Sequence, residues 1–309
     1  MNYTSFIENQ ISEIRKKVGT AKVISALSGG VDSAVATVLV HKAVGYQLDA
    51  VFIDDGLMRE NEFEKVSMAM KKSGVNVRLV EAQHEFFTAL KRKDDPEEKR
   101  KAFRNTFYTV LGRIVRQSSA KYLVQGTIKA DIDETKGGVK TQHNVLEQIG
   151  LDPSGYGLNI IEPLKDFYKP EVREIAKQLG LPEEIHQRMP FPGPGLATRV
   201  VGEANPESIA IVKKAAAIVE EETKELKPFQ AFAVLMNDKA TGLEGKERKF
   251  GNIIIIRCVD SEDALTASAT YIPWHILMKI TERITHELNS VVRVAYEITG
   301  KPPATIEYV

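Results

Sequence analysis

The sequence is poor in cysteine. Its one cysteine, Cys258, excludes an intramolecular disulfide and a zinc site built from cysteines. Cys258 follows the run 253–257, which is typical of a buried strand, so we interpret it as a packed thiol and not as a nucleophile. A chain without disulfides is expected in the cytosol.

Long apolar runs and net charge are absent too. No stretch reaches the roughly 18 apolar residues of a membrane span, and the first residues lack the apolar segment of a secretory signal. The 42 Lys+Arg residues balance the 42 Asp+Glu residues, which argues against a general nucleic-acid binder. We therefore expect neither a membrane nor a nucleic acid as partner.

What is present suffices for a folded protein. The chain has 309 residues, enough for two domains of about 150 residues each. Hydrophobic residues make up 43% of it, so the chain can bury a core and is not a disordered segment.

One stretch carries the clearest chemical signal, the run Ser28–Ser33. It lies between an apolar strand pattern, 23–27, and a helical pattern that starts at Ser33. A strand, a glycine-rich turn and a helix N-terminus form an anion site, because main-chain N–H groups and the helix dipole converge on it. The run lacks the lysine of a P-loop, so we expect it to hold the pyrophosphate end of ATP and to leave the α-phosphate open to attack.

Strand and helix patterns alternate through the first part of the chain, which predicts a doubly wound parallel sheet of the α/β class. The predicted strands cover 22–27, 48–53, 76–80, 122–125 and 159–161. The predicted helices cover 3–18, 33–44, 61–72, a segment beginning at Pro96, and 171–179.

Polar residues follow several of these strands, at the sheet edge where ligands bind. Asp54 and Asp55 follow the second strand and are either ribose acceptors or turn and helix-cap residues. The polar segment from about 128 to 156 shows no clear period and is typical of a lid or a disordered loop. Lys165 and Lys169 precede a helix, where they either neutralise phosphate or lie on the surface.

The composition changes at Met189–Gly195, which has three prolines and two glycines and is a turn or a domain junction. We place a domain boundary near Gly202, giving domains 1–202 and 203–309. The second is a small α+β domain with few strands, so we expect a homodimer to complete it. Its predicted helices cover 206–222 and 274–288, and its predicted strands cover 231–235, 252–259 and 291–297.

Several stretches spread over nearly the whole chain have one order in common with a known family. They are Ser28–Ser33, Val51–Leu57, Asp95–Lys101, Gln125–Thr127, Lys140–Asn144, Glu162–Asp166, Pro190–Leu196 and Lys301–Glu307. Together they resemble the ATP-pyrophosphatase part of GMP synthetases. The loop alone also fits NAD synthetase, argininosuccinate synthetase, asparagine synthetase and tRNA-thiolating enzymes, whereas the last two stretches are similar to GMP synthetases only.

The resemblance implies an adenine nucleotide alpha-hydrolase-like fold, followed by a dimerisation domain. It implies that XMP attacks the ATP α-phosphate through its C2 oxygen and that ammonia then displaces AMP to give GMP, with ATP as co-substrate and Mg²⁺ at Asp32. The implied ATP contacts are Ser28, Gly29, Gly30, Val31, Asp32, Ser33, Ala34, Phe52, Asp54, Leu57 and Gly126. The implied adenylylation residues are Asp131, Glu134, Lys140, His143, Lys165, Asp166 and Lys169. The implied XMP contacts are Arg100, Gln230, Lys301 and Glu307.

The sequence departs from the family pattern at three places. Gln142 replaces the first of two lid histidines, Lys246 replaces an acidic residue of the second domain, and the tail ends in Tyr308-Val309 where Trp-Glu is common. Only the first glutamate of the tail therefore carries over, and acid–base work at 142 is not expected.

The sequence also lacks an amidotransferase domain with a nucleophilic cysteine. We therefore expect the chain to use free ammonia or to receive it from a separate glutamine amidotransferase subunit. Two other functions remain open at this point, an NAD synthetase and a nucleotide-binding regulatory module without turnover.

Overall fold

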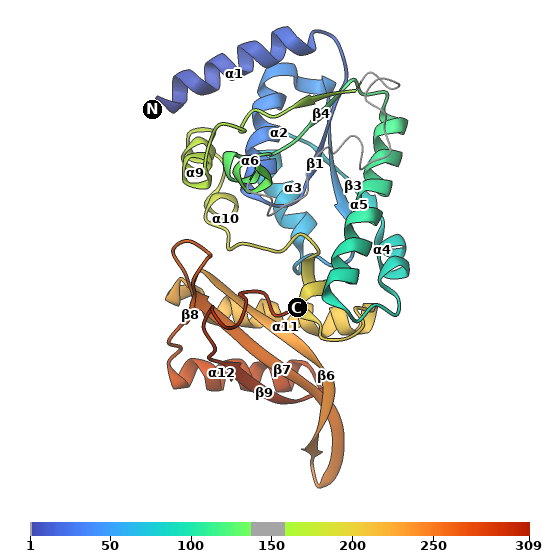
Figure 1. The fold of residues 1–309 in the computed structure, drawn as a ribbon, viewed down its shortest axis with the longest axis vertical. Coiled ribbons are helices and arrows are strands. Elements are labelled where there is room, and N and C mark those ends of the chain that lie inside the picture. Colours follow the sequence, from blue (N-terminus) through green and yellow to red (C-terminus); the bar gives the residue numbers. More distant parts are fainter. Residues whose placement is uncertain (1, 137–157) are drawn as a thin grey trace. The chain divides into compact units, whose positions relative to one another are not determined.

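The structure is a computed structural model that describes residues 2–136 and 158–309 (Figure 1). Its contacts divide the chain into two compact units, each discontinuous in sequence. The first unit comprises Met1–Asp54, Asn61–Ala82 and Asn105–Arg188. The second comprises Asp55–Glu60, Gln83–Arg104 and Met189–Val309. The domain boundary near Gly202 stays a prediction.

A parallel sheet of five strands forms the centre of the first unit, as the alternation of strands and helices predicted. In spatial order its strands are β3 (Val77–Glu81), β2 (Leu48–Asp54), β1 (Val23–Leu27), β4 (Tyr122–Val124) and β5 (Asn159–Ile161). Ser25 of β1 pairs with Ala50 on one side and with Val124 on the other, so β1 is central. The direction of the connections reverses at β1, which makes the carboxyl ends of β1 and β4 the switch point where ligands bind in such sheets.

Helices cover this sheet. They are α1 (Tyr3–Val18), α2 (Val31–Val44), α3 (Glu62–Lys72), α6 (Lys129–Lys136), α9 (Lys169–Gln178) and α10 (Glu183–His186), with the short 3₁₀ helix η1 (Gly45–Gln47). Helix α5 (Pro96–Ser118) contributes its second half to this unit. Most of α2 is buried, because α1 and α9 pack against it on the side away from the sheet. Right-handed crossovers in opposite directions place α2 and α5 on opposite faces of the sheet (Figure 1).

The second unit is α+β, as predicted. Its strands are β6 (Gln230–Glu244), β7 (Glu247–Asp260), β8 (Ser268–Ala269) and β9 (Val291–Glu297). Strand β7 pairs antiparallel with β6 and β8 and parallel with β9. The helices are α4 (Gln83–Leu90), the first half of α5, α11 (Pro206–Glu222) and α12 (Trp274–Glu287), with the 3₁₀ helices η2 (Gly195–Arg199) and η3 (Lys224–Leu226).

Four elements differ from the predicted ones. Residues 129–136 are helical (α6), although they were expected to belong to a segment without regular structure. The helix α4 and the short strand β8 were not predicted. Strands β6 and β7 extend far beyond 231–235 and 252–259 as a long hairpin that is plain in Figure 1. The remainder of the predicted lid, 137–156, lies outside the described residues.

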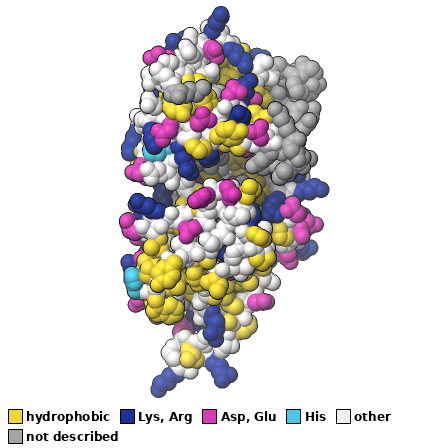
Figure 2. Space-filling view, turned by 60° about the vertical axis from the view of Figure 1, so that its left-hand side comes forward, with side chains coloured by type: hydrophobic (Ala, Val, Ile, Leu, Met, Phe, Trp, Pro, Cys, Tyr) yellow, Lys and Arg dark blue, Asp and Glu magenta, His cyan; other side chains and the backbone are white. Residues whose placement is uncertain are grey.

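Three further observations bear on the predicted class. Cys258 is fully buried in β7, and burial raises the pKa of its thiol to about 11, as expected of a packed residue. In the part of the chain that the structure describes, no helix is long and apolar enough to span a membrane. Basic and acidic side chains are interspersed over the face drawn in Figure 2, in keeping with the balanced net charge.

Candidate active site

The predicted phosphate loop, Ser28–Ser33, joins the carboxyl end of central strand β1 to the N-terminus of α2. Gly29 has a positive φ of 77°, which a side chain would disfavour. Gly30 is the N-cap of α2 and supplies no side chain to bond the first helical N–H groups. The hydroxyls of Ser28 and Ser33 share a hydrogen bond of 3.1 Å, which closes the loop. A helix N-terminus without a side-chain cap is available to an anion.

A cavity of about 310 Å³ opens at this loop. Its lining comes from the loop, the end of β4 and the second half of α5, and consists of Ala26, Ser28, Asp32, Ser33, Phe107, Tyr108, Leu111, Leu123, Val124, Gln125, Gly126, Thr127 and Asp131. Polar groups of the loop therefore border one part of the cavity, and aromatic and aliphatic side chains of α5 and β4 border another. This combination suits a nucleotide, whose base is apolar on its faces and whose phosphates are charged.

Asp32 is the carboxylate of this cavity. Burial raises the pKa of Asp32 above its ordinary value, while the ammonium of Lys169, which donates to Asp32 Oδ2, opposes that rise. Its other oxygen, Oδ1, is buried and has no hydrogen-bond partner among the described residues. Asp131 also lines the cavity, and its charge adds to the rise in the pKa of Asp32.

This donor set fits Mg²⁺. An orphaned, buried carboxylate oxygen beside a phosphate-type loop is an oxygen ligand of the kind that Mg²⁺ takes, usually one or two carboxylates together with substrate phosphates. The described residues contain no group of three or more His, Cys, Asp or Glu side chains that could hold a metal by themselves. Substrate phosphates would therefore have to complete the coordination of an ion at Asp32.

Gly126 lies where the end of β4 meets the loop. A Cβ at this position would come within 2.7 Å of the Ser33 amide nitrogen and 2.8 Å of the Asp32 carbonyl carbon. Main-chain atoms cannot yield cheaply, so only glycine permits this approach. Gly126 therefore fixes the separation between β4 and the start of α2, which sets the width of the cavity.

The remaining predicted ATP contacts lie elsewhere in their units. Val31 and Ala34 are buried in α2, and Phe52 is buried in β2, 5.7 Å from the ring of Phe63. Leu57, in the second unit, is fully buried, and its carbonyl accepts a hydrogen bond from the Leu196 amide. None of these side chains is among those that line the cavity. Their contacts with ATP stay predictions.

Two interpretations were open for the acidic pair after β2. Asp55 Oδ1 accepts a hydrogen bond of 2.7 Å from the Leu57 amide, which is the geometry of a turn-forming aspartate. The turn interpretation therefore accounts for Asp55, whereas Asp54, at the end of β2, keeps its predicted role toward the nucleotide as a prediction.

The predicted adenylylation residues divide into two groups. Asp131 and Lys169 both approach Asp32, so the structure brings these three together. Lys165 and Asp166 are exposed after β5. Lys140, His143 and the side chain of Glu134 lie outside the described part of the structure, as does Gln142.

The predicted XMP contacts all belong to the second unit, and two of them touch. Gln230 Nε2 donates a hydrogen bond of 2.5 Å to Glu307 Oε1. Arg100, in the first turn of α5, donates to the main-chain oxygen of Val309 over 3.0 Å and pairs with Glu97 over 2.5 Å. The tail that carries Glu307 is therefore joined to both Gln230 and Arg100.

Arg199 was not predicted, yet it is the residue that organises this cluster. Its guanidinium is completely buried and contacts both oxygens of Glu307, from Nε at 3.2 Å and from Nη2 at 3.1 Å. The guanidinium also lies 4.1 Å from the ring centroid of Phe232 and 5.0 Å from that of Phe191. A bidentate pair of this kind fixes the orientation of the carboxylate as well as its charge.

Lys99 is a second missed residue. Its side chain is fully buried, and its ammonium donates to the main-chain oxygens of Val200 (2.6 Å) and Ala197 (3.4 Å). Burial lowers the pKa of Lys99 to about 8, against the opposing charge of Asp94. Lys99 thereby holds the η2 segment that carries Arg199. The only sequence signal was the charged run 91–101, which composition alone marks as a solvated helix end.

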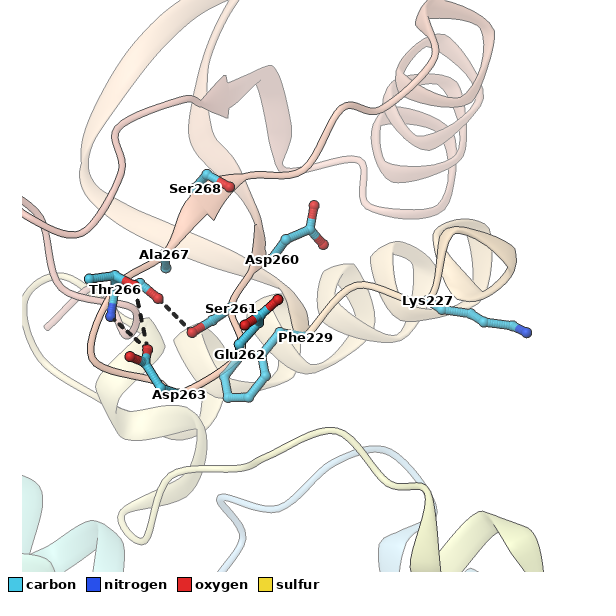
Figure 3. Close-up of a pocket in the computed structure, with 9 residues that line it drawn as sticks. All are labelled: Lys227, Phe229, Asp260, Ser261, Glu262, Asp263, Thr266, Ala267 and Ser268. Carbon is cyan, nitrogen blue, oxygen red and sulfur yellow. Dashed lines mark hydrogen bonds between the residues drawn. The ribbon is translucent and has the colours of Figure 1, made fainter. Parts of the chain in front are cut away.

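Lys301 is placed differently. Its main chain pairs with Ala267, and its ammonium donates to the Ala264 oxygen over 2.9 Å. The adjoining loop lines a cavity of about 710 Å³ whose residues Figure 3 draws. This cavity carries the carboxylates of Asp260, Glu262 and Asp263, while Lys227 extends away from them (Figure 3).

The chemistry of that larger cavity does not suit a nucleotide phosphate. Asp263 accepts from the amides of Leu265 and Thr266, and these hydrogen bonds, that of Thr266 foremost, lower its pKa below the ordinary value. Ser261 Oγ donates to the Thr266 oxygen over 2.5 Å. The polar groups thus serve the conformation of the loop itself, and the negative charge that remains repels phosphate.

The parallel sheet, its glycine-rich loop and the carboxylate beside an uncapped helix N-terminus define a nucleotide-binding protein of the PP-loop class. A family model described as the PP-loop domain matches residues 3–182. A second model, described as the GMP synthase C terminal domain, matches residues 217–308.

Curated relatives narrow this class further, and all three compared here carry the name of one subunit of a glutamine-hydrolysing GMP synthase. The relative from Archaeoglobus fulgidus is 51% identical over 309 residues, which cover 100% of both chains. The relative from Pyrococcus abyssi is 50% identical over 311 residues, again with 100% of both chains covered. That from Methanocaldococcus jannaschii is 48% identical over 308 residues and 98% of each chain. The chain belongs to this family of GMP synthase subunits.

Proposed function

We propose that the chain is the synthetase subunit of a GMP synthase, a ligase that forms a carbon–nitrogen bond at the expense of ATP. The observation that carries the proposal is the uncapped N-terminus of α2 behind Ser28–Ser33, joined in one chain to a GMP synthase C-terminal domain. The C2 oxygen of XMP attacks the α-phosphorus of ATP, the bond to the bridging oxygen breaks, and pyrophosphate leaves. Ammonia then attacks C2, AMP leaves with the C2 oxygen, and loss of a proton gives GMP.

In the first unit, the loop grips the pyrophosphate. Main-chain N–H groups and the hydroxyls of Ser28 and Ser33 donate to its oxygens, and Lys169 supplies a positive charge beside Asp32. Asp32 Oδ1 would hold Mg²⁺, which neutralises phosphate charge when bound. Asp131 lies on the same cavity wall, and the apolar side chains of Phe107 and Leu111 suit the adenine. Lys140, His143 and Glu134 are proposed to join them during adenylylation, and Lys165 and Asp166 to contact the phosphates.

In the second unit, Glu307 and Gln230 would contact the purine, and Arg100 and Lys301 the remainder of XMP. Arg199 keeps Glu307 ionised and oriented, so that the carboxylate can only accept hydrogen bonds. Such an acceptor favours a purine that presents an N–H group. The present contact of Lys301 with the Ala264 oxygen would have to be exchanged for the nucleotide phosphate.

The reaction assay tests this function directly. Pyrophosphate release from MgATP should require XMP, and GMP should form when ammonium is added. An NAD synthetase would instead release pyrophosphate with deamido-NAD, and a binding module without turnover would release none. Either result would exclude the GMP synthase function.

A separate glutamine amidotransferase subunit is proposed as the source of ammonia, since the relatives are named as one subunit of a glutamine-hydrolysing enzyme. The isolated chain should form GMP from ammonium salts but not efficiently from glutamine. Efficient use of glutamine by the purified chain would contradict this partner. The cytosolic location expected from the single cysteine stays a prediction.

We further propose that the second unit forms a homodimer. Figure 2 shows hydrophobic side chains gathered over this unit, and three of the exposed ones are close in sequence at the start of α12. Tyr271 is 83%, Trp274 73% and Met278 50% exposed. A second copy is the occupant that an exposed apolar face of this kind fits. Light scattering should give a dimer that the pair Trp274→Arg, Met278→Glu converts to a monomer; a monomeric parent chain at micromolar concentration would refute it.

A further inference from the structure

Behind the phosphate loop, on the main-chain side of Gly29, lies an ion pair that the reaction above does not use. Arg188 donates from Nη1 to the Gly29 carbonyl oxygen over 2.8 Å and from Nη2 to the carboxylate of Glu62. The side chain of Glu62 is only 4% exposed and that of Arg188 16%. All three residues belong to the first unit, although Arg188 and Gly29 are 159 positions apart.

The hydrogen bond to Gly29 determines which way the next peptide group faces. A trans peptide points its C=O and its N–H in opposite directions. Because Arg188 holds the Gly29 carbonyl on its own side, the Gly30 N–H faces away from Arg188. It faces the Ser28 hydroxyl, 3.4 Å away, and Ser28 lines the cavity beside α2.

Without this restraint the peptide between two glycines is free to rotate. Neither residue has a side chain to bias it, and glycine adopts conformations of both signs of φ with similar ease. A flipped peptide would aim a carbonyl oxygen, in place of an N–H donor, at the cavity. The space behind the loop is also filled, because a Cβ on Gly29 would come within 2.3 Å of Glu62 Oε1.

We propose that Arg188, held by Glu62, is a positioning residue that locks the Gly29–Gly30 peptide with its N–H toward the pyrophosphate. Arg188 acts through the loop and does not touch the nucleotide. Glu62 acts one step further back, by keeping the guanidinium in place and balancing its charge in a buried setting. The inference rests on the proposed role of the loop as the pyrophosphate site.

Arg188→Gln and Glu62→Gln test it, with magnesium pyrophosphate as the probe in calorimetric titrations of the full chain. Arg188→Gln should weaken pyrophosphate binding about ten-fold, the loss expected of one hydrogen bond to a charged group. Glu62→Gln should weaken it by less, and the double variant no more than Arg188→Gln alone, because both changes act on one restraint. In the assay with XMP, KM for MgATP should rise about ten-fold while kcat changes less than about three-fold.

Arg15 provides the matched control. It lies in the same unit and also donates to main-chain carbonyls, those of Ala43 (3.0 Å) and Lys42 (3.2 Å) at the far end of α2. Arg15→Gln should lower stability but leave pyrophosphate affinity unchanged.

The outcomes separate the two claims. If the unchanged chain does not bind pyrophosphate, the proposed role of the loop fails. If it binds, and Arg188→Gln and Glu62→Gln bind equally well, or Arg15→Gln weakens binding as much as they do, the positioning role is wrong. Should Arg188→Gln not fold, Arg188→Lys and Glu62→Gln give the same decision.

Discussion

Removing the guanidinium of Arg199 should destabilise the second unit strongly. Arg199→Met keeps an apolar stem of similar length between the rings of Phe232 and Phe191 but leaves Glu307 without its bidentate partner. Breaking a buried ion pair by deleting one member costs about 3–5 kcal/mol. Glu307 is 21% exposed and can recover part of its hydration, so we expect about 3 kcal/mol, a large share of the roughly 5–15 kcal/mol of a folded protein.

The single tryptophan makes the measurement specific. Trp274 lies in the second unit, so its fluorescence during urea unfolding reports that unit alone. Glu307→Gln and the double variant complete a cycle, in which the coupling between Arg199 and Glu307 should exceed about 1 kcal/mol. The apparent affinity for XMP should fall together with stability, whereas pyrophosphate binding in the first unit should not change. A loss below about 1 kcal/mol for Arg199→Met, or full additivity in the cycle, would refute the reasoning.

Three other predictions follow from the geometry. Gly126→Ala should raise KM for MgATP about ten-fold or more in steady-state assays, since its Cβ would come within 2.7 Å of the Ser33 amide nitrogen; an unchanged KM would show that the loop can move aside. Lys99 has a folded pKa of about 8 against an ordinary value of 10.5, so the unfolded chain holds more protons between these pH values. The unfolding free energy of the parent relative to Lys99→Met should therefore rise by about 2 kcal/mol between about pH 7 and pH 9.5 in urea titrations, and a constant difference would contradict the burial argument. Burial raises the pKa of Asp32, so magnesium pyrophosphate affinity should fall on acidification at a higher pH than for an ordinary aspartate, and Asp32→Asn should remove that part of the pH profile in calorimetry.

The local parts of this molecule were predictable from its sequence. The phosphate loop is encoded by adjacent residues, a strand, two glycines and a helix start, and the structure has the predicted arrangement. Helices such as α11 also match prediction, since Asn205 caps α11 and Pro206 opens it. Such signals act over a few residues and need no knowledge of the tertiary fold.

The hairpin shows where a periodic signal ends. The buried pattern of β6 stops at Leu235, and beyond a register shift between Leu235 and Lys239 the strand continues with mostly exposed residues. Main-chain pairing up to Glu244 and the positive φ of Gly245 at the turn maintain it, and neither leaves an apolar alternation to read. Helix α6 was missed for the same reason, because it is short and polar.

The supporting arginines could not be predicted, because their partners are remote. Arg199 meets Glu307 across 108 positions, and Arg188 meets Glu62 across 126. A buried arginine has no local signature, and only the fold brings the partner to it. The resemblance to GMP synthetases indicated Glu307 and Gln230, which the structure does bring together, but not the residue that orients them.

Pyrophosphate release by the purified chain, measured with MgATP in the presence and absence of XMP and of ammonium, tests the central claim most directly. The account predicts no release without XMP, and stoichiometric AMP, pyrophosphate and GMP when XMP and ammonium are both present. Release that is indifferent to XMP, or XMP-dependent release without GMP when ammonium is added, would contradict it.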